Sequence, residues 1–328
     1  MKSSDVALLR ALHSSAAHQL PGDLCEALAL SQAALGERLE ALSAAGFGIE
    51  RHPTLGVRLV STPDRLVADD LLARIVPGGL IREIVVLAET DSTNNRAADA
   101  GRIGAAAGLV IFAEAQSAGR GRFGRAWASA SHRGLWFSLL LRPEFPFSLW
   151  PRLTTWTAVA LARAIEAQAG CLAQIKWPND VFLDGRKVAG ILIETGVDAS
   201  GAAFAVVGIG LNVNQTTVDF PEELRSRATS IRKTTDHAID RPALAAAILD
   251  ELHAQWPLLA DSFPQIVSEA ERRSVLIGKW VAIKAGEEVS EGFAEGLDSE
   301  GLLLLRDGRG EVHAVNAGEA TLLTGIEK

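Results

Sequence analysis

The sequence is poor in cysteine, with Cys25 and Cys171 as its only two representatives among 328 residues. The two thiols are far apart and fit no metal-ligand spacing, which excludes a disulfide framework and a cysteine-rich metal site. We expect both to be small buried apolar residues in a reducing compartment.

Long apolar runs and an excess of positive charge are also absent. No apolar run reaches the roughly 18 residues that cross a bilayer. The first residues carry Asp5 and lack the apolar core and cleavage site of a signal peptide. The net charge of −8 argues against an extended nucleic-acid surface and leaves only a local basic patch open. We therefore expect a cytoplasmic protein with no membrane partner.

The composition is that of a globular protein, with 48% apolar and 22% charged residues. Its length suits two or three domains. The pattern of helices and strands predicts an α/β (α+β) protein with four consecutive parts. These are an N-terminal domain (1–62), a linker helix (63–81), a central domain (82–272) and a C-terminal domain (273–328).

Residues 1–62 show three helical stripes followed by two short strands. Ser31 is placed to cap the third helix, which should end at Gly46. Strands are predicted over 49–51 and 57–60, on either side of a Pro- and Gly-containing turn. Three helices and a β-wing are the pattern of a winged helix-turn-helix domain.

The central domain mixes strands and helices, whereas the C-terminal domain is strand-like throughout. A linker helix over 64–75 precedes a Pro-Gly-Gly break at 77–79. Strands are predicted over 84–88, 109–113, 135–141, 188–194 and 204–208, and helices over 150–168 and 242–259. This mixture predicts a central mixed sheet with flanking helices. Four further strands within 280–315 predict a small β-barrel.

The densest motif is the glycine- and arginine-rich run from Gly119 to Arg125, which contains GxGxxG. A dinucleotide fold requires a helix directly after this turn. Here the chain continues through Gly134 into a strand, so we reject that interpretation. The remaining interpretation is a loop whose backbone approaches a ligand closely while arginines bind phosphate or carboxylate. A solvated basic loop is the alternative for this motif taken alone.

Lys176-Trp-Pro-Asn-Asp180 forms a second motif at the end of a strand. An amide beside a carboxylate suits Mg²⁺ that stays largely hydrated and bridges to ATP phosphates, and an ordinary Asn-Asp turn is the alternative. The following hairpin brings Lys187 onto the return strand, where an exposed surface lysine is the plainer interpretation.

Two polar segments complete the set. The segment 89–95 follows a strand and precedes a helix, so its small polar side chains either cap that helix or surround a polar head group such as a ureido. The segment 208–214 ends a strand with glycines and asparagines, which allows close backbone approach and amide hydrogen bonds to a nucleotide.

Together these motifs resemble the bifunctional biotin ligase–repressor family of bacteria (BirA) over nearly the whole chain. The motifs that carry the resemblance occur in the family's order. They are Asp91-Ser-Thr-Asn94, Gln116 with Gly119-Arg-Gly-Arg-Phe-Gly124, Lys176-Trp-Pro-Asn-Asp180, Lys187-Val-Ala-Gly-Ile-Leu192 and Gly208-Ile-Gly-Leu-Asn212. The segments 220–224 and 228–230 are similar to the family's adenine-proximal region. The resemblance implies a class II synthetase-like central domain and an SH3-like C-terminal barrel.

The resemblance also implies a role for individual residues. The biotin site would comprise Ser92, Thr93, Asn94, Gln116, Gly119, Arg120, Gly121, Arg122, Lys187 and Gly190. The ATP site would comprise Arg120, Arg122, Trp127, Lys176, Asn179 and Asn212, with Asp180 as a ligand of Mg²⁺. Lys187, Arg122 and Arg120 would be the catalytic residues.

The implied activity is that of a biotin–protein ligase, which uses ATP and Mg²⁺ to form biotinyl-5′-AMP and pyrophosphate and then biotinylates a carrier lysine. The biotin carboxyl carrier protein of acetyl-CoA carboxylase is the implied partner, and a homodimer and operator DNA stay open. A lipoate or octanoate ligase and a biotin sensor without catalysis are the alternatives.

The expected recognition helix is a poor electrostatic match for DNA. Glu37 and Glu40 outweigh Arg38 in it, and phosphate contacts depend on lysine and arginine. Arg51, His52 and Arg58 add some positive charge in the wing. The sequence therefore allows two kinds of role for this domain: repression of biotin-synthesis genes by an adenylate-bound dimer, or a retained domain that stabilises the enzyme or covers its ligand.

Overall fold

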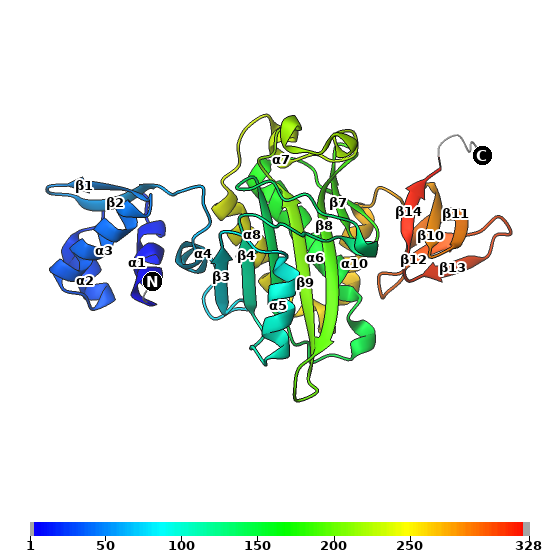
Figure 1. Cartoon of the computed structure of the whole chain (residues 1–328), viewed down its shortest axis with the longest axis horizontal. Coiled ribbons are helices and arrows are strands. Elements are labelled where there is room, and N and C mark those ends of the chain that lie inside the picture. The colour runs from blue at the N-terminus through cyan, green and yellow to red at the C-terminus, as the bar shows by residue number, and fades with distance from the viewer. Residues whose placement is uncertain (1–2, 324–328) are drawn as a thin grey trace.

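The computed structural model describes residues 3–323, which form three successive bodies along the long axis of the molecule (Figure 1). The N-terminal body contains α1 (Ser3–His13), α2 (Pro21–Leu28), α3 (Gln32–Ala44) and the hairpin β1 (Gly48–His52) and β2 (Gly56–Ser61). The predicted order of three helices and two strands is confirmed. Ser31 caps α3 as predicted, because its hydroxyl accepts a hydrogen bond from the Ala34 N–H at 3.1 Å.

The linker helix α4 (Ala68–Arg74) is shorter than predicted. The prediction began it at Asp64, but the backbone of 64–66 is engaged by the central domain instead. The Asp64 carbonyl accepts from Arg241, and the Leu66 N–H donates to Glu114. These tertiary hydrogen bonds replace the ones that a longer helix would make, so the segment does not join the helix.

Helix α4 binds the N-terminal body to the rest of the chain. Arg10 of α1 donates to the Leu72 and Ala73 carbonyls, and His13 lies 2.7 Å from the carboxylate of Asp70. Ala73 is buried in the apolar cluster of the N-terminal helices. The same helix packs on α8 (Arg241–Gln255), so it contacts both bodies.

The central body is built on a seven-stranded mixed sheet in the order β3-β4-β5-β9-β8-β7-β6. Its strands are β3 (Glu83–Leu87), β4 (Leu109–Ala113), β5 (Gly134–Leu141), β6 (Gln174–Lys176), β7 (Asp180–Leu183), β8 (Arg186–Val197) and β9 (Ala203–Asn212). Strands β3 and β4 run parallel, and every other neighbouring pair is antiparallel. The predicted central mixed sheet is confirmed.

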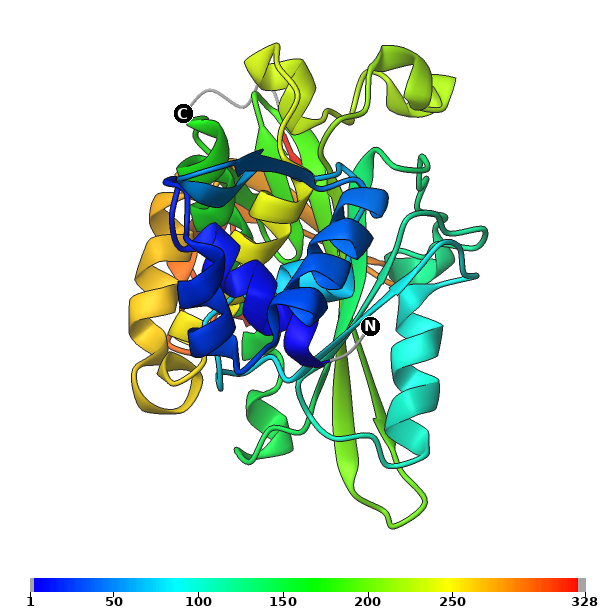
Figure 2. The ribbon, with the colours of Figure 1, turned by 90° about the vertical axis from the view of Figure 1, so that its left-hand side faces the viewer.

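Helices cover both faces of this sheet (Figure 2). On one face lie α6 (Arg152–Ala169), α8 and α10 (Phe263–Arg272), which enclose the main apolar core. On the other face, α5 (Thr93–Arg102) covers a smaller cluster around Phe204. Two short helices, α7 (Ile231–Thr235) and α9 (Leu258–Asp261), complete the central body. Helix α10 and the three- and four-residue strands β6 and β7 had no separate prediction.

The C-terminal body is a five-stranded antiparallel sheet in the order β13-β12-β11-β10-β14. It comprises β10 (Trp280–Ala285), β11 (Glu288–Leu297), β12 (Leu303–Arg306), β13 (Val312–Val315) and β14 (Glu319–Leu322). The first four strands match the prediction, whereas β14 was not predicted. Trp177 of the central body packs into the core of this sheet and donates to the Gly301 carbonyl at 3.2 Å.

Cys25 and Cys171 are free thiols and are half-buried rather than fully buried. Each lies at the margin of an apolar cluster, where a small side chain fills space without being enclosed. Within residues 3–323, no helix has both the length and the apolar character that a membrane span requires.

Arg241 is a buried charge that contacts several segments of the fold. Its side chain is fully buried, and its guanidinium pairs with the Glu114 carboxylate at 2.7 Å and with the Asp64 carboxylate at 3.2 Å. It also donates to the Gly134 carbonyl at 3.1 Å. Because Glu114 directly follows β4 and Gly134 begins β5, this residue joins the linker to two strands of the sheet.

We predict that Arg241→Met lowers the free energy of unfolding by about 3–5 kcal/mol, because the Glu114 carboxylate is left buried without its cation. Chemical denaturation followed by tryptophan fluorescence measures the change. The control is Arg102→Met, which removes an exposed ion pair to Asp99 and should cost less than about 1 kcal/mol. Equal losses in the two variants would contradict the prediction.

Candidate active site

A cavity of about 550 Å³ opens where the central sheet meets the C-terminal body. Its walls are the glycine- and arginine-rich loop, the start of α5, the β6–β7 turn, the strands β8 and β9, the segment 220–228 and residues 318–320. Every residue that the sequence predicted for the site lines this cavity, except Gly119. Gly119 is buried beside it, because a Cβ atom on Gly119 would lie 3.1 Å from Nε2 of the lining residue Gln116. The motifs, which are dispersed over more than 100 residues, are therefore brought together.

Glycines on two neighbouring strands form the floor. Gly190 of β8 is paired with Gly210 of β9, and the Trp127 indole lies over both. A Cβ atom on Gly210 would lie 2.5 Å from the Trp127 ring, and one on Gly190 would lie 2.9 Å from it. Only glycine therefore permits the indole to pack flat on the sheet at this place. The indole provides an apolar surface inside a cavity lined by charges.

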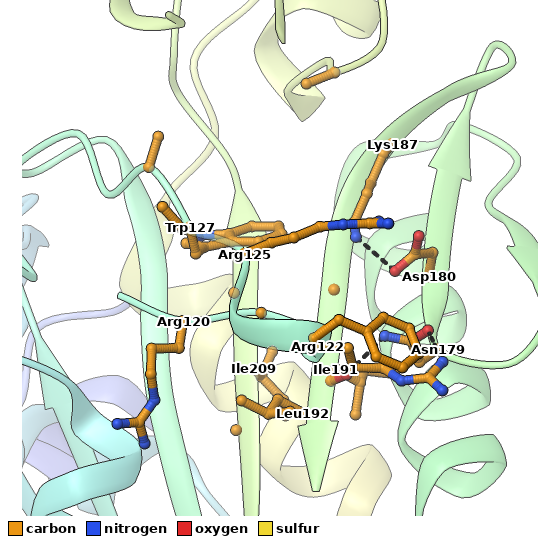
Figure 3. A pocket seen from close by; sticks show the side chains of 18 of the residues that line it. Arg120, Arg122, Arg125, Trp127, Asn179, Asp180, Lys187, Ile191, Leu192 and Ile209 are labelled. Atoms are coloured by element: carbon orange, nitrogen blue, oxygen red, sulfur yellow. Dashed lines mark hydrogen bonds and ion pairs between the residues drawn. The ribbon is translucent and has the colours of Figure 1, made fainter. Parts of the chain in front are cut away.

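Lys187 and Asp180 face each other across the β7–β8 hairpin, with 2.6 Å between Nζ and Oδ1 (Figure 3). The ammonium also lies 5.4 Å from the centroid of the Trp127 ring. The backbone of Lys187 is held by the segment behind it, because its N–H donates to the Arg227 carbonyl and its carbonyl accepts from Thr229. The position of this lysine is thus fixed by main-chain as well as charge contacts.

Arg122 crosses the cavity toward the β6–β7 turn (Figure 3). Its guanidinium donates to Asn179 Oδ1 at 2.9 Å and to the Gly318 carbonyl at 3.4 Å. Burial lowers the pKa of Arg122, against the effect of nearby Asp180. Asn179 in turn donates to the Ile191 carbonyl at 2.9 Å, so the turn is anchored on both sides.

The C-terminal body contributes a carboxylate that the sequence analysis did not identify. Glu319, the first residue of β14, forms an ion pair with Arg125 of the loop. The hydrogen bond between them lowers the pKa of Glu319 and raises the pKa of Arg125. Nothing local in the sequence indicates this contact, because the two residues are 194 positions apart. Phe123, which the sequence did not assign either, is exposed at the rim and stacks with Arg122.

Polar side chains at the start of α5, together with Gln116, form a polar wall of the cavity. The Thr93 N–H donates to Gln116 Oε1 at 2.8 Å, and Gln116 Nε2 donates to Ser129 Oγ at 3.1 Å. Asn94 donates to Glu194 and accepts from Ser138. Ser92, Thr93 and Asn94 are all buried.

Arg120 points away from Lys187 and lies against Glu194, with 3.2 Å between Nη2 and Oε1 (Figure 3). It therefore lines the cavity without joining the cluster of Lys187, Asp180 and Arg122. Asn212 is buried at the far end, where it donates to the Thr229 carbonyl at 3.0 Å. Phe220 and Ala228, which belong to the two segments that are similar to the family's adenine-proximal region, also line the cavity.

Positive charge predominates in the cavity. Six cationic side chains line it, namely Arg120, Arg122, Arg125, Lys176, Lys187 and Arg227, against the two carboxylates of Asp180 and Glu319. No histidine or cysteine is among the lining residues. The arrangement suits a reaction between bound anionic groups in which the protein binds, orients and neutralises charge.

The fold and cavity define a ligase of the biotin and lipoate class. Residues 86–214 match the Biotin/lipoate A/B protein ligase family, and residues 276–323 match the Biotin protein ligase C terminal domain. The structure of a biotin protein ligase from Aquifex aeolicus in complex with biotin and ATP is similar, with a TM-score of 0.64 and 31% identity. The match covers 74% of this chain and 99% of that one.

Among curated proteins, the bifunctional ligase/repressor BirA of Bacillus spizizenii is 33% identical over 88% of this chain and 89% of its own length. The biotin–[acetyl-CoA-carboxylase] ligase of Mycobacterium tuberculosis is 34% identical over 79% of this chain and 95% of its own. The chain belongs to the BirA family of biotin protein ligases.

Asp91, just before the polar wall, gives a test of the local hydrogen bonds. Donation by the Asn95 side chain, then by the Ser92 N–H and the Thr90 hydroxyl, lowers the Asp91 pKa from 3.8 to about 2. A lowered pKa means that these contacts stabilise the folded state above pH 3.8 and lose this effect as the pH falls toward 2. Carboxyl-detected NMR should show Asp91 still ionised at pH 3.5. Asn95→Ala should raise this pKa, and an identical titration in both proteins would contradict the prediction.

Proposed function

We propose that the chain is an ATP-dependent biotin–protein ligase. It joins the biotin carboxylate to the α-phosphate of ATP, releases pyrophosphate and then passes biotin to a lysine of a carrier protein. The observation that carries this proposal is the cavity itself, where Lys187, Arg122 and the Trp127 indole surround a glycine floor. Relatives named as biotin ligases support the choice of biotin.

The residues account for both substrates. Ser92, Thr93, Asn94 and Gln116, together with Gly121 and Gly190, would form the biotin end, and Trp127, Lys176, Asn179 and Asn212 would bind ATP. Lys187 would bind the biotin carboxylate and reduce its repulsion from the phosphate. Holding the two reacting groups in line supplies about 7–11 kcal/mol of the barrier. Arg122 would stabilise charge on the phosphate in the closed cavity.

Asp180 suits a Mg²⁺ ion that arrives with ATP. Mg²⁺ commonly uses one or two protein carboxylates together with phosphate oxygens and water. The Asp180 carboxylate lines the cavity within reach of Lys187, and the other lining carboxylate, Glu319, is held by Arg125. Asp180 would therefore hold the ion, whose charge would help neutralise the phosphates.

The domain division follows from the same proposal. Residues 1–62 would be a winged helix-turn-helix domain, 63–81 its linker, 82–272 the catalytic domain and 273–328 an SH3-like barrel. The carrier would be the biotin carboxyl carrier protein of acetyl-CoA carboxylase, as the names of relatives suggest. A homodimer and operator DNA are the further partners that a bifunctional relative would have.

A biotin-responsive repressor role rests on the names of relatives more than on the charges of the N-terminal domain. Arg38 of α3 forms an ion pair with Asp5 at 2.8 Å, and Arg58 of β2 forms one with Glu50 at 2.6 Å. These carboxylates compete with phosphate for the two arginines. An electrophoretic shift assay on the organism's own biotin-synthesis promoter, with biotin and ATP present, decides this role.

Pyrophosphate release with Mg²⁺–ATP and biotin, lipoate or octanoate tests the proposed ligase function. Release with biotin alone is expected. Release with lipoate or octanoate would move the chain to the sister activity, and no release with any of the three would favour a sensor that has lost catalysis.

Lys187→Ala should abolish biotin-dependent pyrophosphate release, with a loss of at least about a hundredfold, because the carboxylate loses its cation. The control is Lys284→Ala, an exposed lysine of β10 that lies outside the cavity and should leave the rate unchanged. Normal release by Lys187→Ala would refute the role of this lysine.

Arg122→Ala should leave adenylate synthesis measurable but let biotinyl-5′-AMP escape, because the loop loses its contacts with Asn179 and Gly318. Rapid gel filtration after a single turnover measures the fraction of adenylate retained. We expect retention to fall by about tenfold relative to the wild-type chain. Equal retention would show that Arg122 does not keep the loop closed.

A further inference from the structure

Glu194 lies where the polar wall meets the arginine loop, and none of the sequence motifs includes it. It belongs to β8, and its side chain is 37% exposed. Its Oε2 atom accepts from Asn94 Nδ2 at 2.7 Å, and Arg120 Nη2 lies 3.2–3.3 Å from both of its oxygens. One carboxylate thus binds a side chain of the wall and a side chain of the loop.

The Asn94 amide has a single orientation. Its nitrogen faces the Glu194 carboxylate, which can only accept, so its oxygen must face Ser138, 2.6 Å away. A Cβ atom on Gly208 would lie 2.0 Å from Asn94 Oδ1, so the amide is also packed tightly against β9. Both ends of this amide are used inside the protein. Asn94 therefore supports the wall rather than offering a free group to the cavity.

This orientation determines the hydrogen-bond direction along the wall. The Ser138 hydroxyl lies within 2.6 Å of Asn94 Oδ1 and 2.8 Å of Thr93 Oγ1, but it has one proton. Because the amide oxygen has none, Ser138 donates to Asn94, and the proton between Ser138 and Thr93 comes from Thr93. The chain of hydrogen bonds ends at the Glu194 carboxylate.

Because Thr93 donates its hydroxyl proton to Ser138, its oxygen keeps a free lone pair. Thr93 lines the cavity, so this oxygen can accept a hydrogen bond from a ligand there. A ligand with N–H groups at this wall, such as a cyclic urea, finds an acceptor in place. With the chain reversed, Thr93 would use one lone pair to accept from Ser138, and its proton would point to Gln116 Oε1, 3.3 Å away, or into the cavity, so the wall would be a poorer acceptor.

We propose that Glu194 is a positioning residue, which sets the acceptor character of the wall through Asn94 and Ser138 and holds Arg120 against that wall. The inference rests on the proposed function for its ligand, biotin. It adds a structural reason for ureido recognition, namely the direction of the hydrogen-bond chain from Thr93 through Ser138 and Asn94. This chain ends at Glu194, which lies outside the motifs.

The test compares Glu194→Gln and Glu194→Ala with the full wild-type chain. Glutamine has nearly the same shape as glutamate but can donate as well as accept, so it removes the constraint that Glu194 places on the Asn94 amide and leaves only the longer contact of Nδ2 with the Leu192 carbonyl at 3.4 Å. The matched control is Glu295→Gln, since Glu295 of β11 also pairs with a partly exposed arginine, Arg306, and lies outside the cavity.

In pyrophosphate-release kinetics, Glu194→Gln should raise KM for biotin by about tenfold and leave KM for ATP and kcat within about twofold. Glu194→Ala should raise KM for biotin at least as much, and Glu295→Gln should behave as wild type. An unchanged KM for biotin would overturn the proposal. A parallel loss of kcat, both KM values and thermal stability would do so too, because it would indicate a purely structural role.

A second readout needs no ligand. Trypsin should cleave after Arg120 several-fold faster in Glu194→Gln than in the wild type and in Glu295→Gln, as mass spectrometry of the fragments can show. An unchanged cleavage rate would show that Glu194 does not hold Arg120 in place. This conclusion would not depend on which substrate the enzyme uses. A wild-type chain that releases no pyrophosphate with biotin would instead refute the proposed function, so the two failures are distinguishable.

Discussion

The packing of the Trp127 indole and the Asn94 amide directly on three glycines of β8 and β9 is the constraint on which the site depends. A sheet in a protein core is normally covered by side chains on both faces. At Gly190, Gly208 and Gly210 the covering is provided by side chains from other segments, namely the Trp127 indole and the Asn94 amide. Any larger residue at these positions would displace those groups. The Trp127 indole and the Asn94 amide can therefore form walls of the cavity only because these three positions carry no side chains.

Electrostatics then determines what this space can contain. The cations around the glycine floor exceed the carboxylates. Three of them are held by an acidic partner: Lys187 by Asp180, Arg125 by Glu319 and Arg120 by Glu194. Arg122 is held by neutral oxygens of Asn179 and Gly318. These contacts keep flexible side chains in place before substrates bind, which reduces the entropy lost on binding. An anionic substrate then replaces a carboxylate or shares its cation.

The sequence predicted those parts of the fold and site that depend on neighbouring residues. The Ser31 cap and the main strands of the sheet follow from local pattern, and the motif residues of the cavity follow from the resemblance. Contacts between distant segments were not predictable. Glu319 binds Arg125 from another domain, and Glu194 joins Arg120 to Asn94 across strands. The linker helix was predicted too long for the same reason, since Arg241 and Glu114 bind its first residues from far along the chain.

The contact of the loop with Gly318 and Glu319 has a consequence for the order in which the protein is made. The floor, the polar wall and the loop are all translated before residue 213, but the strand that closes the cavity is synthesised about 100 residues later. A nascent chain can therefore fold its central sheet while the arginine loop still lacks its acidic partner. The cavity reaches its final shape only when β14 has joined β10, so the arginine loop gains its acidic partner after the other parts of the site have been translated.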